Sequence, residues 1–147
     1  MTQWSSEIRQ ELRRLVVDAV QRTVRQVGGH AAVALSGGVD SSTVASIATE
    51  LPLFTGWYDG GEDYDERPWA ELVARDREWH QVQITPTHFV ECFDQVRAAL
   101  GNLKCGPGAV GQYVVARHIT DLGHDTIITG EGGDELFGGY ARQYVVA

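Results

Sequence analysis

The stretch AAVALSGGVDSS, residues 31–42, decides the fold class of this chain of 147 residues. Its first half, residues 31–35, is a short apolar run that suits a buried strand, and it ends abruptly at the SGG of residues 36–38. A helical pattern of apolar side chains follows over residues 40–51. The stretch therefore predicts a strand, a tight turn and a helix in immediate succession.

The same alternation continues along the chain. Strand-like runs recur at residues 53–58, 80–84 and 125–129, and helical patterns at residues 66–77, 86–100 and 109–122. Strands that alternate with crossover helices form an open parallel sheet with helices on both faces, so we expect a Rossmann-like α/β fold. An amphipathic helix over residues 5–27 comes first. We expect one domain over residues 1–147, with this helix in residues 1–28 and the core in residues 29–147.

Composition excludes several classes of partner. The chain has 12 Lys and Arg against 20 Asp and Glu, and its formal net charge of -8 would repel a phosphate backbone. We therefore expect no nucleic acid partner. No apolar stretch approaches the roughly 18 to 20 residues that a membrane helix needs, and the first residues are not signal-like. We expect no membrane contact, a cytoplasmic location, and free thiols at Cys92 and Cys105.

The loop after the first strand has the features of a phosphate site. It lies between a strand and a helix, so its backbone N–H groups and the positive helix end can meet an anion. Asp40 would repel a phosphate unless a cation lies between them, which predicts a magnesium ion held by Asp40. Two glycines allow close approach of the main chain, and three hydroxyls offer donors: Gly37, Gly38, Ser36, Ser41 and Ser42.

The string SGGVDSS resembles the SGGxDSS signature of the PP-loop ATP pyrophosphatases. This resemblance implies that the loop holds the pyrophosphate of ATP and that the reaction releases AMP. A kinase-type phosphate loop needs a lysine after its second glycine and a longer spacing, and this string has neither. Taken alone, the string leaves open NAD synthetases, GMP synthetases, tRNA-thiolating enzymes and asparagine synthetases.

A second glycine-rich string, GEGGDELFGGY at residues 130–140, follows the fourth strand-like run. The carboxyl ends of parallel strands share one edge, where ligands bind, so Glu131 and Asp134 should come beside the loop that carries Asp40. Carboxylates on neighbouring loops can share a metal ion, as phosphoryl transfer often requires. Glycines interleave these acids in a way that no ordinary helix tolerates, which makes a solvated helical face a poor alternative.

This second string resembles the GEGxDExFGGY signature of asparagine synthetases, and the resemblance extends roughly from residue 27 to residue 140. It implies that Asp40 and Asp134 hold magnesium pyrophosphate and that Glu131 belongs to the reaction centre. The related beta-lactam synthetases carry a tyrosine at that point, so Glu131 favours the asparagine synthetase side. The resemblance also implies main-chain contacts to adenine and ribose from Leu35, Gly56, Thr129 and Gly130. A glycine inside a strand can equally mark a bulge, which is the alternative at Gly56.

The implied reaction forms an amide. A carboxylate, most commonly aspartate in the family, attacks the α phosphorus of ATP to give an acyl-AMP and pyrophosphate, and an amine then displaces AMP. Family members normally begin with a glutaminase domain and continue into a helical region with a lysine that meets the α phosphate. This chain runs from Met1 to Ala147, and its lysine, Lys104, matches no such position. We therefore expect ammonia from solution or from a separate glutaminase subunit, and a partner chain for the helical region. The alternatives are an ATP-binding module or half of a split synthetase without independent activity, or a scaffold for a partner synthetase.

Overall fold

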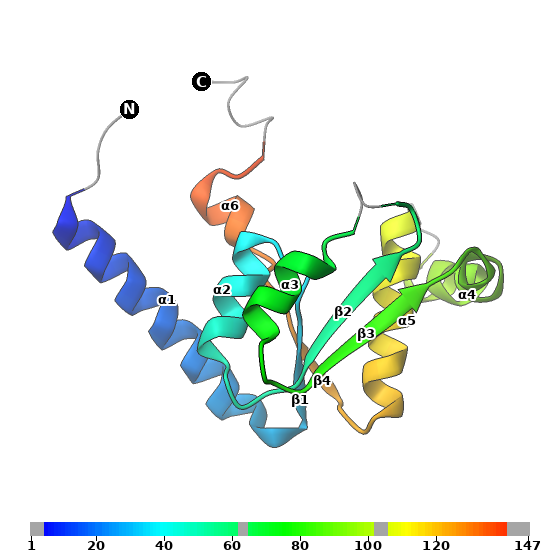
Figure 1. Ribbon diagram of the computed structural model, residues 1–147, viewed down its shortest axis with the longest axis horizontal. Coiled ribbons are helices and arrows are strands. Elements are labelled where there is room, and N and C mark those ends of the chain that lie inside the picture. Colours follow the sequence, from blue (N-terminus) through cyan, green and yellow to red (C-terminus); the bar gives the residue numbers. More distant parts are fainter. Residues whose placement is uncertain (1–4, 62–64, 102–105, 141–147) are drawn as a thin grey trace.

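A computed structural model describes residues 5–61, 65–101 and 106–140 of the chain (Figure 1). Four strands form one sheet in the order β3-β2-β1-β4, and every neighbouring pair is parallel. The strands are β1 (Ala31–Ala34), β2 (Leu53–Tyr58), β3 (Trp79–Ile84) and β4 (Thr126–Ile128). The predicted α/β fold with an open parallel sheet is confirmed.

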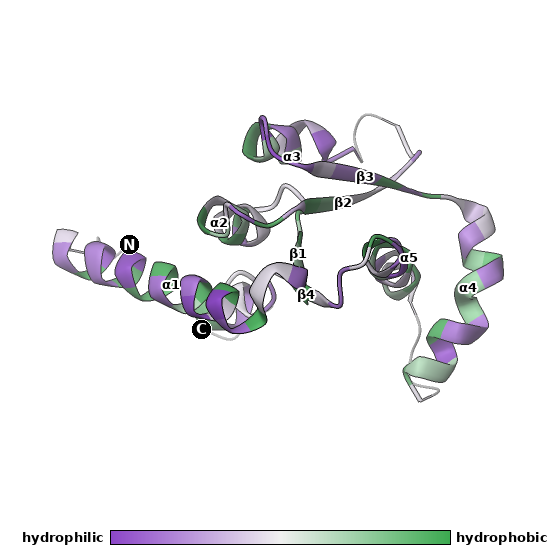
Figure 2. Ribbon diagram, turned by 90° about the horizontal axis from the view of Figure 1, so that it is seen from below, coloured by the Kyte–Doolittle hydropathy of each residue, from purple (hydrophilic) through white to green (hydrophobic). Residues whose placement is uncertain are grey.

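Helices cover both faces of the sheet (Figure 2). Helices α1 (Ser6–Val27), α2 (Val39–Ile47) and α3 (Arg67–Ala74) lie on one face, and α4 (Pro86–Ala99) and α5 (Pro107–Asp121) lie on the other. A 3-10 turn, η1 (Gly28–His30), joins α1 to β1, and a short helix, α6 (Gly133–Phe137), follows β4. The chain thus forms three layers, with the sheet in the middle.

Each face of the sheet has its own apolar core, because successive side chains of a strand point to opposite faces. Val33 and Leu53 pack in the first core with α1, α2 and α3. Ala32 and Phe54, their direct neighbours in sequence, pack in the second core with α4 and α5. The central strands are therefore apolar on both faces, which is why the runs at residues 31–35 and 53–58 read as continuous rather than alternating.

Two predicted helices end earlier than expected. Helix α2 ends at Ile47 rather than residue 51, and α3 ends at Ala74 rather than residue 77. Arg77 lies beyond α3 and donates to the carbonyl oxygens of Ala45, Ala48 and Leu51 at 2.6, 2.6 and 2.8 Å. These bonds satisfy carbonyls at the end of α2 with a side chain instead of with further helix.

Helix α1 packs against the rest of the domain through its second half. Val24 is buried in the first core, with Val20 and Val27 packed beside it. In the first half, by contrast, Ile8 and Leu15 are about half exposed, at 53% and 50%. None of the helices in the described residues has the length and apolar character needed to cross a membrane. Lys104 and Cys105, which the sequence predictions mention, lie outside the described residues.

Candidate active site

The site lies where the strand order reverses. The chain goes from β1 outward to β2 and β3, then crosses the sheet so that β4 pairs with the other edge of β1. The loops after β1 and β4 therefore leave neighbouring strand ends in different directions and open a crevice. We call residues 36–42 the first loop and residues 129–139 the second loop. Both glycine-rich strings of the sequence lie at this crevice, as the alternating pattern predicted.

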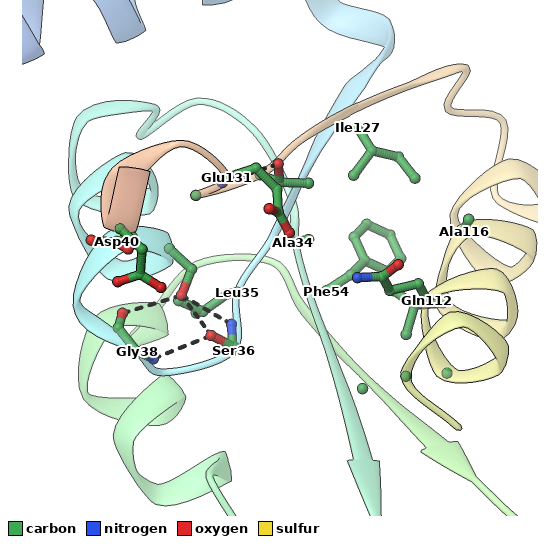
Figure 3. Close-up of a pocket in the computed structure, with 18 of the residues that line it drawn as sticks. Ala34, Leu35, Ser36, Gly38, Asp40, Phe54, Gln112, Ala116, Ile127 and Glu131 are labelled. Carbon is green, nitrogen blue, oxygen red and sulfur yellow. Dashed lines mark hydrogen bonds between the residues drawn. The ribbon is translucent and has the colours of Figure 1, made fainter. Parts of the chain in front are cut away.

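An open cleft with a volume of about 870 Å³ occupies the crevice (Figure 3). One part, the polar wing, is lined by both loops, with Ser36, Gly38, Asp40, Ser41, Gly130, Glu131 and Asp134. The other part, the apolar wing, is lined by all four strands and α5, with Ala34, Phe54, Gly56, Ile84, Gly111, Gln112, Val115, Ala116 and Ile127. A ligand that fills both wings would need a strongly polar end and a flat apolar body.

Hydroxyl groups shape the first loop. The Ser41 hydroxyl donates to the carbonyl of Gly38 at 3.2 Å and accepts from the Ser36 N–H at 3.2 Å. The two hydroxyls of Ser36 and Ser41 lie 2.9 Å apart, and the Gly38 N–H donates to the Ser36 hydroxyl at 3.2 Å. Helix α2 begins after Gly38, which has no side chain to cap it. The first-turn N–H groups of α2 are therefore available to an anion in the polar wing.

Two residues of the first loop do not line the cleft. Gly37 has a φ of 91° and backs onto α3, where an added Cβ would lie 2.9 Å from the carbonyl oxygen of Glu66. A glycine is required at position 37 because of both this backbone conformation and the close contact with α3. The hydroxyl of Ser42 is buried and has no hydrogen-bond partner within the described part of the chain. Ser42 thus lies behind the cleft wall, while the other predicted residues of this loop line the cleft.

The second loop touches the first through its glycines. A Cβ on Gly130 would lie 2.6 Å from the Ser41 backbone nitrogen, and a Cβ on Gly133 would collide with the Asp40 carboxylate. The Asp40 carboxylate therefore rests against the start of α6, one residue before Asp134. The interleaved glycines were expected to exclude a helix, and that expectation is wrong. Gly132 and Gly138, at φ 98° and 73°, flank the short helix α6 as its caps.

Three carboxylates face the cleft without cationic partners. No Lys, Arg or His in the described residues pairs with Asp40, Glu131 or Asp134. Within the same residues, no three His, Cys, Asp or Glu side chains are grouped so as to hold a metal ion alone. Magnesium is commonly held by one or two carboxylates together with phosphate oxygens and water. Asp40 and Asp134 therefore fit a magnesium ion that arrives with a polyphosphate.

The residues expected to meet adenine and ribose also line the cleft: Leu35, Gly56, Thr129 and Gly130. Gly56 pairs with Val82 in an unbroken register between β2 and β3, so it marks no bulge. A Cβ there would lie 2.7 Å from Val115 and 2.9 Å from Ile84. The glycine is a packing requirement that lets α5 lie close to β2.

Sequence reasoning missed the contribution of α5 and of the aromatic side chains. Phe54, Tyr58, Gly111 and Gln112 line the cleft, yet they belong to no motif. The sequence indicates only the element on which each of them lies. Phe54 and Tyr58 lie on a predicted strand, and Gly111 and Gln112 lie on a predicted helix. Which helix face meets the cleft depends on how the crossover packs, and periodicity alone does not specify this.

An ion pair supports the first loop from behind. Asp65 accepts hydrogen bonds from the Arg67 side chain at 2.7 to 3.0 Å and from the Arg67 N–H at 3.0 Å. These hydrogen bonds hold the pKa of Asp65 below its ordinary value. The Arg67 guanidinium also lies 3.6 Å from the centre of the Trp57 ring. Together these contacts fix the start of α3, against which Gly37 rests.

The fold and this cleft define an α/β domain of Rossmann-like type with its ligand crevice at the switch point of the sheet. Residues 11–146 match the family model described as asparagine synthase, and the chain belongs to that family. The family is one of ligases that form carbon–nitrogen bonds, with a role in amino-acid biosynthesis.

The chain is similar to two asparagine synthetases and to one protein named as an amidase. The chain is 30% identical over 141 residues to putative asparagine synthetase [glutamine-hydrolyzing] 1 of Methanocaldococcus jannaschii, across 92% of this chain and 26% of that protein. It is 29% identical over 141 residues to asparagine synthetase [glutamine-hydrolyzing] 1 of Bacillus subtilis, across 88% of this chain and 21% of that protein. It is also 28% identical over 160 residues to amidase chry2 of Gibberella zeae, across 91% and 23%. The chain thus spans about a quarter of the length of these relatives.

Proposed function

We propose that this chain forms the ATP-binding and carboxylate-activating part of an asparagine-synthetase-type ligase. The observation that carries the proposal is the contact of Gly130 and Gly133 with Asp40, which brings three carboxylates to one polar wing beside the helix start of α2. A polyanion with bound magnesium suits such a wing. The adjoining apolar wing suits the adenosine of ATP.

In this proposal the triphosphate lies against the first loop. The first-turn N–H groups of α2 and the hydroxyls of Ser36 and Ser41 contact phosphate oxygens. Ser42 joins them only if its buried hydroxyl turns toward the cleft. Main-chain groups of Leu35, Gly56, Thr129 and Gly130 would contact ribose and adenine. Magnesium, held by Asp40 and Asp134, would neutralise charge on the pyrophosphate leaving group.

The chemistry would proceed in two displacements. A carboxylate oxygen of the substrate attacks the α phosphorus, and the bond to the bridging oxygen of pyrophosphate breaks, which leaves an acyl-AMP. Ammonia then attacks the acyl carbon and AMP departs with the bonding electrons. Glu131 lines the cleft and its side chain is exposed, so it is available to accept the proton that the attacking nitrogen loses (Figure 3). The chain's contribution is chiefly position and charge.

The names of the relatives support aspartate as the acid. The nitrogen would come as ammonia from solution or from a separate glutaminase subunit. A cytoplasmic location belongs to the same proposal.

A second candidate is an ATP-binding half of a split synthetase. The described residues that line the cleft include no Lys or Arg, although a phosphate site commonly uses one. The chain also spans only about a quarter of its relatives. In this version ATP binds here and a partner chain completes the adenylation site.

Exchange of pyrophosphate into ATP separates these candidates. The assay would contain magnesium and a panel of carboxylic acids led by aspartate, with Asp40→Ala and Asp134→Ala as test variants. Asp94→Ala, an exposed acid on α4, is the matched control. Acid-dependent exchange that only the test variants abolish supports the ligase. ATP binding without exchange supports the half-enzyme, and no ATP binding contradicts both.

A further inference from the structure

The apolar wing contains a side-chain amide that the proposed function does not use. Gln112 lies on α5, and its amide is directed into the cleft on the side of Phe54 and Ile127 (Figure 3). The residues around it in this wing are mainly aliphatic, aromatic or glycine. Gln112 is exposed, and it has no hydrogen-bond partner among the residues that the structure describes.

Close packing fixes the position of this amide. Gly111, the preceding residue, is buried, and a Cβ there would collide with the Tyr58 hydroxyl. One turn later, Val115 meets the bare Cα of Gly56. These contacts hold the first turns of α5 against β2, so the Gln112 side chain starts from a defined point at the cleft wall.

The chemistry of an amide suits the edge of a nucleobase. A glutamine offers both an acceptor oxygen and a donor NH₂ group, and such a pair can bind the amino group and the neighbouring ring nitrogen of adenine together. Aliphatic walls of a pocket provide affinity for a flat base but little selectivity between different bases. The polar edge of the base then decides which nucleotide binds best.

We propose that Gln112 recognises the nucleobase by accepting a hydrogen bond from the 6-amino group of adenine. This inference rests on the proposed function, since it assigns the apolar wing to the base of ATP. Main-chain groups of the strands hold the nucleoside, while this one side chain on α5 sets the preference for adenine.

Calorimetric titration with two nucleotides tests the assignment. ATP is compared with purine riboside triphosphate, which lacks only the 6-amino group, both in the presence of magnesium. The test variant is Gln112→Ala, and Gln10→Ala, at an exposed position on α1, is the control. Gln112→Ala should weaken ATP binding about three- to tenfold, the range for one hydrogen bond, and weaken binding of the analogue by a clearly smaller factor, since the analogue keeps only the ring nitrogen. Gln112→Glu keeps the acceptor oxygen and should retain part of the preference for ATP.

Each other outcome contradicts the assignment. Equal losses for the two nucleotides would show that Gln112 serves packing, and no change would show that the amide does not reach the base. A change confined to the dependence on the carboxylic acid would assign Gln112 to that substrate instead. If the unmodified chain binds neither nucleotide, the proposed function itself is wrong and this inference falls with it. Thermal unfolding by circular dichroism verifies that each variant is folded.

Discussion

The first and second loops meet in one cleft but keep their shapes by opposite means. In the first loop, the hydroxyls of Ser36 and Ser41 make four contacts of 2.9 to 3.2 Å within the loop. In the second loop, the turn that leads into α6 has only long hydrogen bonds, at 3.4 Å from the Glu131 N–H to the Thr129 hydroxyl and from the Gly133 N–H to the Gly130 carbonyl, and bonds of 2.9 to 3.1 Å begin with α6. The second loop packs closely against the first because Gly130 and Gly133 have no side chains.

The difference shows what kind of substitution each loop should resist. A loop held by hydroxyls loses stability when a hydroxyl is removed. A loop that fits because Cβ atoms are absent loses stability when one is added. Unfolding free energy measures how each substitution affects the fold, and ATP affinity measures how a substitution in either loop affects the cleft.

The largest effect is expected from Gly130→Ala in the second loop. The new Cβ would lie 2.6 Å from the Ser41 nitrogen and 2.8 Å from the Asp40 carbonyl carbon, and backbone atoms cannot turn aside. We expect a loss of about 2 to 3 kcal/mol in unfolding free energy and loss of ATP binding, because the loops must separate. Gly29→Ala is the control, since a Cβ there meets nothing within 4 Å. Equal effects of the two substitutions would contradict the view that the two loops pack closely because Gly130 has no Cβ.

Arg77→Met tests the support at the far end of α2, the helix that carries the first loop. The substitution removes three hydrogen bonds to carbonyls near the end of that helix. We expect a loss of about 2 kcal/mol in chemical denaturation, with a smaller effect on ATP affinity than Gly130→Ala has. Arg9→Met, on the exposed half of α1, should change the unfolding free energy by less than about 0.5 kcal/mol. A loss no greater than that of Arg9→Met would contradict the anchoring role.

Ser41→Ala and Ser42→Ala form a matched pair within the first loop. Ser41→Ala removes the hydroxyl that bonds Ser36 and Gly38, and should cost about 1 to 2 kcal/mol. The Ser42 hydroxyl is buried without a partner in the described residues, so its removal should be neutral or slightly stabilising. If Ser42→Ala leaves stability intact but lowers ATP affinity, its hydroxyl turns toward the phosphates on binding. A greater loss of stability for Ser42→Ala would reverse our account of the loop.

The smallest effect is expected from Asp65→Asn, behind the first loop. Hydrogen bonds from Arg67 lower the pKa of Asp65 below its ordinary value of 3.8, so the carboxylate stabilises the fold above that value. The contribution is lost as the pH falls through the lowered pKa. Unfolding of the wild type and of Asp65→Asn should therefore differ at neutral pH and converge once the pH has fallen below the lowered pKa of Asp65. A difference that persists in acid would point to packing instead of charge.

Much of this architecture follows from local sequence signals. The run at residues 53–58 predicts β2 with its observed bounds, and Thr85 with Pro86 predicts the start of α4, where Thr85 and His88 form a capping box. Third-strand pairing begins one residue before the predicted start, at Trp79. Such signals suffice because strand ends and helix caps depend on neighbouring residues.

The rest depends on contacts between distant segments. Arg77 ends α2 through bonds that span 26 to 32 residues, which no local pattern contains. Helix α6 forms among glycines because Gly132 and Gly138 take left-handed conformations at its two ends. In the cleft, the two glycine-rich strings predicted most of the residues that they contribute, with Gly37 and Ser42 as exceptions, whereas Gln112 enters through the packing of α5 on Gly56.

The strand order also bears on how the chain folds. Strand β1 can pair with β2 as soon as the chain reaches Tyr58, but its other edge stays unpaired until β4 arrives more than 60 residues later. An open apolar strand edge can pair with other chains, so a folding intermediate without β4 is prone to aggregate. The pairing of β4 both closes that edge and brings the second loop to the first. Completion of the cleft and protection of the growing sheet are therefore one late event of folding.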